Sequence, residues 1–265
     1  MIAKSLLWRI RQEGQPASYL FGTMHVKDDI AYAHVDKAIK ALYTCIDFMT
    51  EIDLVKAQDI IQPSDYCIPN GGKISELLGE RKFMKACRIL DKAFGFNLNL
   101  VDQLYPIFVV SKLTESLLNE ENSLPLDAYL WEQAQRLNMN CTGLEEPQDQ
   151  VKVLNALDME LQLKMLKDTV ANVSKFKKST LKLINAYGDQ DIQVLFKKSA
   201  ESLGSFRKLL LFDRNEFMTE RISSNIATAT FYAIGAAHLA GQKGILNLLK
   251  KRGFQLKPVK LDKRP

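Results

Sequence analysis

Short apolar runs alternate with polar turns along the first part of the chain. Residues 5–10 (SLLWRI) and 17–25 (ASYLFGTMH) are largely apolar, and the glycine and proline between them are typical of a turn, so we expect a β-hairpin. Residues 35–45 place apolar side chains at helical spacing, and residues 45–54 (CIDFMTEIDL) follow as a buried strand that ends in acids. This order predicts a strand–helix–strand unit and hence a parallel sheet.

The centre of the chain has a helical pattern. Residues 73–138 contain three stretches with apolar residues at helical spacing, and a short strand that ends in acids follows at 139–147. The pattern is helical again over 148–228, where lysines lie opposite an apolar stripe formed by Met159, Leu163, Leu166, Val170 and Val173. Residues 228–261 predict a strand, a turn, a helix and a final strand.

These patterns predict one α/β domain over residues 1–265. Both chain ends contribute strands to a central, mostly parallel sheet, and a helical subdomain or lid is inserted at about residues 150–228. With 265 residues, 46% of them apolar, the chain is long enough to bury one large core.

Charge and composition exclude some classes of function. The net charge is +5, and the basic stretch at 250–265 accounts for it, with Phe254 as its only aromatic residue. Nucleic-acid surfaces combine basic and exposed aromatic residues, so we expect no nucleic-acid partner. No apolar run approaches the roughly 18–20 residues of a membrane span, and the N-terminus does not resemble a signal peptide. We expect a cytoplasmic protein, or a periplasmic or secreted one if a leader has been removed.

Two segments share one pattern. Residues 19–25 (YLFGTMH) and 232–238 (YAIGAAH) each have a tyrosine, a glycine three residues later and a histidine three residues after that, and together they use two of the three histidines. Glycine at a strand end allows a sharp turn or a close approach of the backbone. His25 and His238 are then expected at the carboxyl edge of the sheet, where α/β proteins bind ligands.

Two carboxylates are expected at the same edge. Glu51 ends one predicted strand and Glu145 ends another. Two neutral imidazoles and a carboxylate are a ligand set for a divalent metal that activates water. Each of these residues also has a structural alternative: a core or helix-capping histidine, or a solvated strand end. The third histidine, His34, precedes a predicted helix, and we interpret it as structural.

The same residues carry a family resemblance. The segments LLWRI…SYLFGTMHV, FMTEIDL, LDAYL…GLEEPQDQ, LLLFDRNEFMTERI and FYAIGAAHLAGQKGILNLLKKRGFQLKPV resemble the TraB/PrgY/GumN family, which includes the Tiki proteases, over nearly the whole chain. The resemblance implies a fold related to the erythromycin-esterase and ChaN-like proteins. It also implies a metal-dependent protease site formed by His25, His238 and Glu51, with manganese or cobalt favoured over zinc. The family's Arg-Asn pair matches Arg214 and Asn215, which are then expected to bind substrate, with Arg214 also stabilising negative charge.

Our hypothesis is a metal-dependent hydrolase that acts on a peptide, or failing that on a small molecule. A divalent ion (manganese, cobalt or zinc) activates water, and Glu145 serves as general base or as a partner of the metal ligands. One rival is a non-catalytic protein that captures a peptide or small ligand in the same cleft. A second rival is an interaction protein that uses the stripe from Met159 to Val173. The pattern leaves the oligomeric state open.

Overall fold

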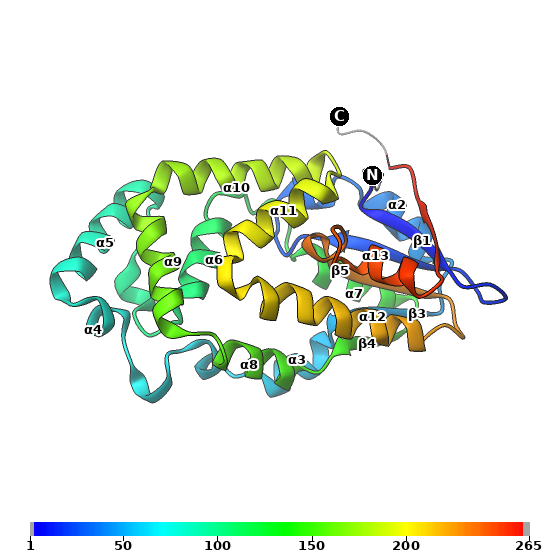
Figure 1. Ribbon diagram of the computed structural model, residues 1–265, viewed down its shortest axis with the longest axis horizontal. Coiled ribbons are helices and arrows are strands. Elements are labelled where there is room, and N and C mark those ends of the chain that lie inside the picture. The colour runs from blue at the N-terminus through cyan, green and yellow to red at the C-terminus, as the bar shows by residue number, and fades with distance from the viewer. Residues whose placement is uncertain (1–2, 262–265) are drawn as a thin grey trace.

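The structure, a computed structural model, describes residues 3–261. Its centre is a six-stranded sheet with the strand order β4–β3–β5–β2–β1–β6 (Figure 1). Four strands are parallel to one another in the order β4–β3–β5–β2, whereas β1 is antiparallel to β2 and β6. The predicted α/β fold with a mostly parallel sheet is therefore confirmed. The strands are β1 (Leu7–Arg11), β2 (Ser18–Thr23), β3 (Asp47–Ile52), β4 (Asn140–Glu145), β5 (Thr230–Gly235) and β6 (Gln255–Pro258).

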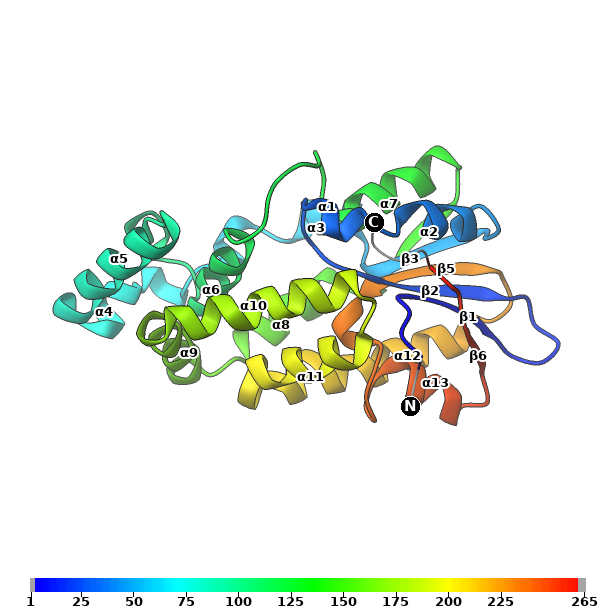
Figure 2. The ribbon, with the colours of Figure 1, turned by 90° about the horizontal axis from the view of Figure 1, so that it is seen from above.

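Helices cover both faces of this sheet, which explains the long apolar runs of its inner strands. In β5, Phe231 and Ile234 are fully buried and Tyr232 is 1% exposed. Parallel strands buried on both faces lose the alternation of polar and apolar residues. One face carries α1 (Asp29–Tyr32), α2 (Val35–Leu42) and α7 (Leu126–Arg136), and the other carries α11 (Ile192–Leu203), α12 (Arg214–Ser224) and α13 (Ile245–Lys251) (Figure 2).

A helical part extends beyond the carboxyl ends of the parallel strands. The β1–β2 turn lies at one end of the molecule and α4 and α5 at the other, so β2 runs toward the helical part (Figure 1). A second hydrophobic cluster, separate from the one around the sheet, holds this part together. Its helices and their neighbours are α3 (Leu54–Ile60), α4 (Ile74–Leu78), α5 (Glu80–Phe94), α6 (Pro106–Glu115), α8 (Pro147–Asn155), α9 (Met159–Ala171) and α10 (Val173–Gly188).

Four of the five residues expected in the apolar stripe, from Met159 to Val170, face this second cluster, whereas Val173 begins α10 and is not part of the cluster. Leu163 and Leu166 of α9 are buried in it, and Met159 and Val170 pack against it. Helices that precede residue 150 contribute to the same cluster, since it also contains Phe83 of α5 and others from α4 and α6. The stripe is thus a core face, which removes the observation that favoured the interaction-protein rival.

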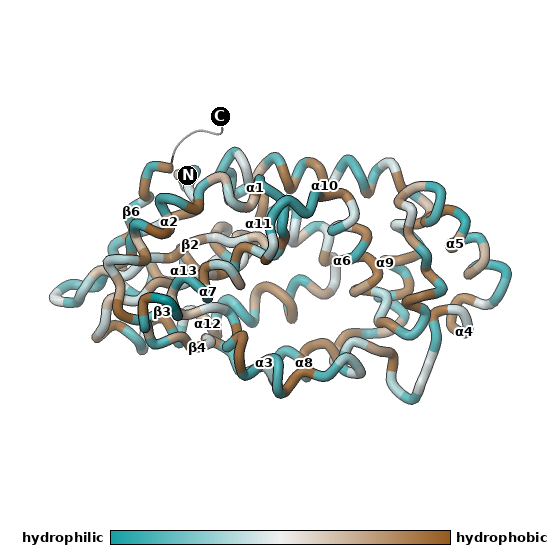
Figure 3. Tube along the Cα trace, turned by 180° about the vertical axis from the view of Figure 1, so that it is seen from behind, coloured by the Kyte–Doolittle hydropathy of each residue, from teal (hydrophilic) through white to brown (hydrophobic). Residues whose placement is uncertain are grey.

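Short helical turns complete the described chain. They are η1 (Pro63–Tyr66), η2 (Pro69–Gly71), η3 (Leu98–Val101), η4 (Gly204–Phe206), η5 (Lys208–Asp213) and η6 (Ala236–His238), of which η5 is a π-helix. No helix within residues 3–261 combines the length and apolar character needed to cross a bilayer. Figure 3 shows polar and apolar residues interspersed along the helices of both parts. The last four residues of the basic stretch 250–265 lie outside the described residues.

Candidate active site

The two G-x-x-H segments follow neighbouring strands. β2 and β5 are parallel partners in which Thr23 lies opposite Gly235 and Gly22 lies opposite Ile234, so the two segments are offset by one residue. A Cβ at Gly22 would come within 2.8 Å of Leu239 Cδ1, so glycine is needed there for the β2 backbone to pack closely. The repeated pattern therefore brings the two chain ends together at one edge of the sheet.

The two histidines differ in exposure. His238 ends η6 and is buried, whereas the side chain of His25 is 63% exposed. Both imidazoles act electrostatically on Glu51, and His25 also acts on His238. These three predicted metal ligands therefore share one electrostatic environment.

Glu51 is held from two sides at the end of β3. Its Oε1 accepts a hydrogen bond from the backbone N–H of Gly235 (2.8 Å), and its Oε2 accepts one from Arg214 Nη2 (2.6 Å). A Cβ on residue 235 would lie 3.0 Å from the same Oε1, so the absence of a side chain keeps this approach open. The Oε1 atom also lies 3.9 Å from His238 Nε2.

The charge state of Glu51 follows from these neighbours. Burial alone would raise the pKa of Glu51, but the charge of Arg214, the two histidines and the Gly235 N–H together hold this pKa well below its usual range. The carboxylate is consequently ionised at neutral pH.

Arg214, at the start of α12, links Glu51 to Glu145. Its Nε donates to both oxygens of Glu145 (3.0 and 3.1 Å), and its Nη2 donates to Glu145 Oε2 (2.5 Å). Burial would lower the pKa of Arg214, but the two carboxylates raise it above its ordinary value. The hydrogen bonds of Arg214 to the described residues all come from Nε and Nη2, and none from Nη1. Of the two adjacent acids at 145 and 146, Glu145 is buried and Glu146 is exposed.

The π-helix η5 ends directly before Arg214. A π-turn carries more residues per turn than an α-helix, and such turns often occur at functional sites. The π-helical turn therefore affects the directions in which the side chains of Arg214 and Asn215, the first residues of α12, point.

Asn215 contacts the imidazole ring of His238. It is fully buried, its Nδ2 donates to the backbone carbonyl of Lys243 (2.7 Å), and its Oδ1 contacts His238 Nδ1 at 2.5 Å. Burial lowers the pKa of His238 to about 4, with Arg214 acting in the same direction and Glu51 opposing it. His238 is therefore neutral at pH 7. The family resemblance implies that Asn215 binds substrate, whereas in the structure both ends of its side chain contact protein groups.

Asp127 is a site residue that the sequence analysis did not find. It lies in the first turn of α7, its side chain is 7% exposed, and its Oδ2 contacts His25 Nδ1. Its Oδ1 is buried and has no hydrogen-bond partner among the described residues. An acid in the first turn of a helix is common because it suits the helix dipole. Asp127 lies in LDAYL, one of the segments that carry the family resemblance, but no local pattern linked it to the distant His25.

The donor atoms at this edge fit a divalent cation by type. A neutral imidazole, a second imidazole and an ionised carboxylate are ligands of manganese, cobalt and zinc. Within residues 3–261, no three His, Cys, Asp or Glu side chains are close enough together to hold an ion as they stand.

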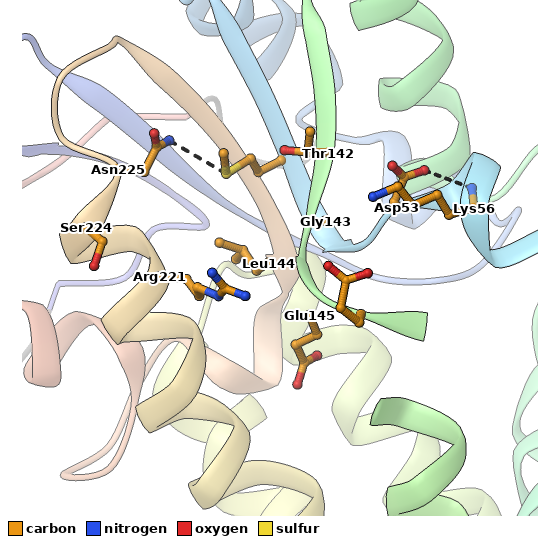
Figure 4. A pocket seen from close by; sticks show the side chains of 11 residues that line it. Asp53, Lys56, Thr142, Gly143, Leu144, Glu145, Arg221, Ser224 and Asn225 are labelled. Carbon is orange, nitrogen blue, oxygen red and sulfur yellow. Dashed lines mark hydrogen bonds between the residues drawn. The ribbon is translucent and has the colours of Figure 1, made fainter. Parts of the chain in front are cut away.

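A cavity of about 320 Å³ adjoins the site along β4 (Figure 4). Glu145 belongs both to the ion-pair network and to the wall of this cavity. The wall also contains Lys56, Glu146 and Arg221, so both signs of charge line it. Thr142 adds a hydroxyl that is buried without a hydrogen-bond partner among the described residues. The cavity therefore suits a polar group located next to the ion-pair network.

Fold and site together define an α/β protein with histidines and carboxylates at the carboxyl edge of its parallel strands. The chain matches the TraB/PrgY/gumN family over residues 6–258 and belongs to this family. This confirms the family resemblance that the sequence shows along nearly its whole length.

Its curated relatives include Tiki metalloproteases at low identity. Metalloprotease TIKI2 of Danio rerio is 24% identical, with 95% of this chain and 60% of that protein aligned. Metalloprotease TIKI1 of Homo sapiens is 22% identical, with 95% and 61% aligned. A Metalloprotease TIKI homolog of Nematostella vectensis is 23% identical, with 97% and 67% aligned. The chain spans about three fifths of the length of the first two proteins.

Proposed function

We propose that this chain is a metal-dependent hydrolase that cleaves a peptide bond. The observation that carries the proposal is the pairing of a buried, neutral His238 with an ionised Glu51, whose Oε1 lies 3.9 Å from the imidazole Nε2. Both atoms are electron-pair donors, and they face each other at a spacing that a cation can bridge. The metalloprotease names of the relatives support the same reaction class.

His25, His238 and Glu51 would hold the ion, which we expect to be manganese, cobalt or zinc. A divalent cation at this edge supplies Lewis acidity, which polarises a carbonyl and makes water a better nucleophile. The protein's own contribution is the protonation state of two of these ligands: Glu51 is ionised because of Arg214, and His238 is neutral because of burial. Ligands that are already deprotonated bind metal without a proton cost at neutral pH.

We assign Arg214 the role of stabilising negative charge on the substrate. Its Nε and Nη2 donate to carboxylates, which fixes the plane of the guanidinium, and Nη1 retains its donors for an oxyanion. Of the two roles expected for Glu145, we favour the partner role, because Arg214 donates to both of its oxygens. The cavity beside Glu145 is our candidate subsite for a polar substrate side chain.

The non-catalytic rival keeps one observation in its favour. No ready-made group of three ligands exists among the described residues, and His25 is largely exposed. A cleft that captures a peptide with these side chains as polar contacts would look the same before a ligand binds.

Metal binding followed by peptide cleavage tests the proposal. Protein treated with chelator would be titrated separately with Mn²⁺, Co²⁺ and Zn²⁺, and bound metal, thermal shift and cleavage of a mixed peptide library would be measured. We expect one ion per chain and cleavage that depends on it. Binding with no cleavage of any peptide would favour the rival, and no binding would overturn the metal site.

A matched pair of variants shows whether the ion binds at this edge. His238→Gln removes one predicted ligand, while His34→Gln removes the third histidine, which contacts the Gly188 carbonyl elsewhere in the fold. Metal binding is expected to be lost in the first variant and retained in the second.

A further inference from the structure

The two G-x-x-H histidines are held in the same way from opposite faces of the sheet. Each contacts a helical polar side chain through Nδ1: His25 contacts Asp127 of α7, and His238 contacts Asn215 of α12. α7 and α12 lie on different sides of the sheet (Figure 2). We propose that Asp127 and Asn215 are positioning residues that keep the ring proton on Nδ1 and leave both Nε2 atoms free to bind a divalent cation. The cation in this inference rests on the proposed function, whereas the position of the ring proton does not depend on it.

The hydrogen bonds around Asn215 determine the tautomer of His238. A backbone carbonyl only accepts, so the group of Asn215 that faces Lys243 O must be its NH₂. The amide oxygen is then the atom that faces His238 Nδ1, and an oxygen in this position only accepts. Nδ1 must therefore carry the proton, and in the neutral ring the lone pair lies on Nε2.

Asp127 imposes the same choice on His25 by a simpler route. With Asp127 as a carboxylate, which only accepts hydrogen bonds, the His25 Nδ1 that it contacts carries the proton. Asp127 is buried in the first turn of α7 whereas the His25 side chain is exposed, so the acid is the better anchored of the two and orients the ring. A carboxylate or amide behind a metal-binding histidine is a recurrent arrangement that fixes both tautomer and ring direction.

For His238, this tautomer determines what its Nε2 atom presents to Glu51. Its Nε2 lone pair faces Glu51 Oε1 at 3.9 Å, which is too long for a hydrogen bond. The opposite tautomer would direct an N–H at Glu51 and block the nitrogen, and Asn215 prevents this. Asn215 thus acts through His238 and does not need to touch a substrate.

Nitrogen NMR of the histidine rings tests the inference directly. The chain has three histidines, so ¹⁵N-histidine labelling gives a spectrum that can be assigned with single His variants. In the chelator-treated wild type at pH 7.5, we expect protonated Nδ1 and unprotonated Nε2 for both His25 and His238. Finding Nε2–H on His238 in the wild type would overturn the assignment for Asn215, and Nε2–H on His25 would overturn it for Asp127.

Variants separate positioning from folding. Asn215→Leu and Asp127→Leu remove the acceptors, and we expect the facing ring to shift toward the Nε2–H form and Co²⁺ affinity to fall by about 10–100-fold. Asn215→Asp and Asp127→Asn each keep an acceptor oxygen, and we expect them to retain the wild-type tautomer. A leucine variant that folds and keeps both tautomer and Co²⁺ affinity would overturn the proposal. If a leucine variant fails to fold, the wild-type spectrum and the conservative variants still decide.

The control is Asp102→Asn in the helical part, where a carboxylate holds Ser75 far from the sheet edge. It should leave the tautomers and Co²⁺ affinity unchanged, and a change in either would contradict a local role for the positioning residues. The tautomers are read without metal. If both histidines carry the proton on Nδ1 but the protein binds no Co²⁺, the hydrolase proposal is refuted, and the assignment of the ring protons to Nδ1 is still supported.

Discussion

Replacement of Arg214 by leucine should leave two buried carboxylates without their countercharge. Arg214 is 16% exposed, and its partners Glu51 and Glu145 are 11% and 7% exposed. Loss of one partner of a buried ion pair typically costs 3–5 kcal/mol, because the remaining charge is not solvated. We therefore expect Arg214→Leu to lower the free energy of unfolding by about 3–5 kcal/mol at pH 7.

The loss should depend on pH with a defined sign. In the wild type, the pKa of Glu51 is depressed, so its contribution to stability is present above the unfolded-state value near 4.5 and is lost as pH falls below it. Without Arg214, burial is no longer outweighed and the pKa of Glu51 should rise above that value. The variant should then become relatively more stable as pH falls from 7 to 5, and the gap to the wild type should narrow.

Urea unfolding at pH 7 and pH 5, followed by circular dichroism, measures both effects. Arg221→Leu is the matched control, because this arginine is exposed on the same helix and its loss should change stability by no more than about 0.5 kcal/mol. Adding Glu51→Gln and Glu145→Gln to Arg214→Leu should restore part of the stability by removing the stranded charges. A loss below about 1 kcal/mol, or a gap that widens toward pH 5, would refute the reasoning.

Two further predictions concern His238 and Gly22. The pKa of His238 is lowered from 6.5 to about 4, so protonation of this ring opposes folding. Between pH 6.5 and 4, the free energy of unfolding of the wild type should fall by up to about 3 kcal/mol relative to that of His238→Gln. Urea titrations measure this difference, and a difference that stays constant with pH would contradict a buried neutral ring. Gly22→Ala would place a Cβ 2.8 Å from Leu239 Cδ1 and 3.1 Å from Ala236 Cα, and should cost about 1–3 kcal/mol by thermal unfolding. Because Gly22 does not have a positive φ, this loss would come from packing, and no measurable loss would contradict the close approach of Leu239 and Ala236.

The order of apolar runs and helical segments was sufficient to predict the mostly parallel sheet, and the repeated pattern of glycine and histidine pointed to one edge of it. Apolar runs on β2, β3 and β5 reflect burial on both faces, and such runs are local in sequence. His238 and Glu51 could be found because each ends or follows a strand, and strand ends of a parallel sheet meet at one edge. The family resemblance added Arg214 and Asn215.

The remaining features depend on contacts that no local pattern encodes. Asp127 contacts His25 only because the fold brings the start of α7 next to the residues that follow β2. The bond from Asn215 to Lys243 depends on the path of the chain after η6. The helical part was expected at about residues 150–228, but the second hydrophobic cluster also draws on α4, α5 and α6, because helices far apart in sequence bury their apolar faces on one another.

The central claim is that His25, His238 and Glu51 together hold one divalent ion. Crystals grown with Mn²⁺ and measured at the manganese absorption edge would test it most directly. We predict a single anomalous peak within about 2–2.5 Å of Nε2 of both histidines and of a Glu51 oxygen. A peak on the Nδ1 side of either ring, a peak elsewhere on the chain, or no peak from crystals saturated with Mn²⁺ would contradict the account.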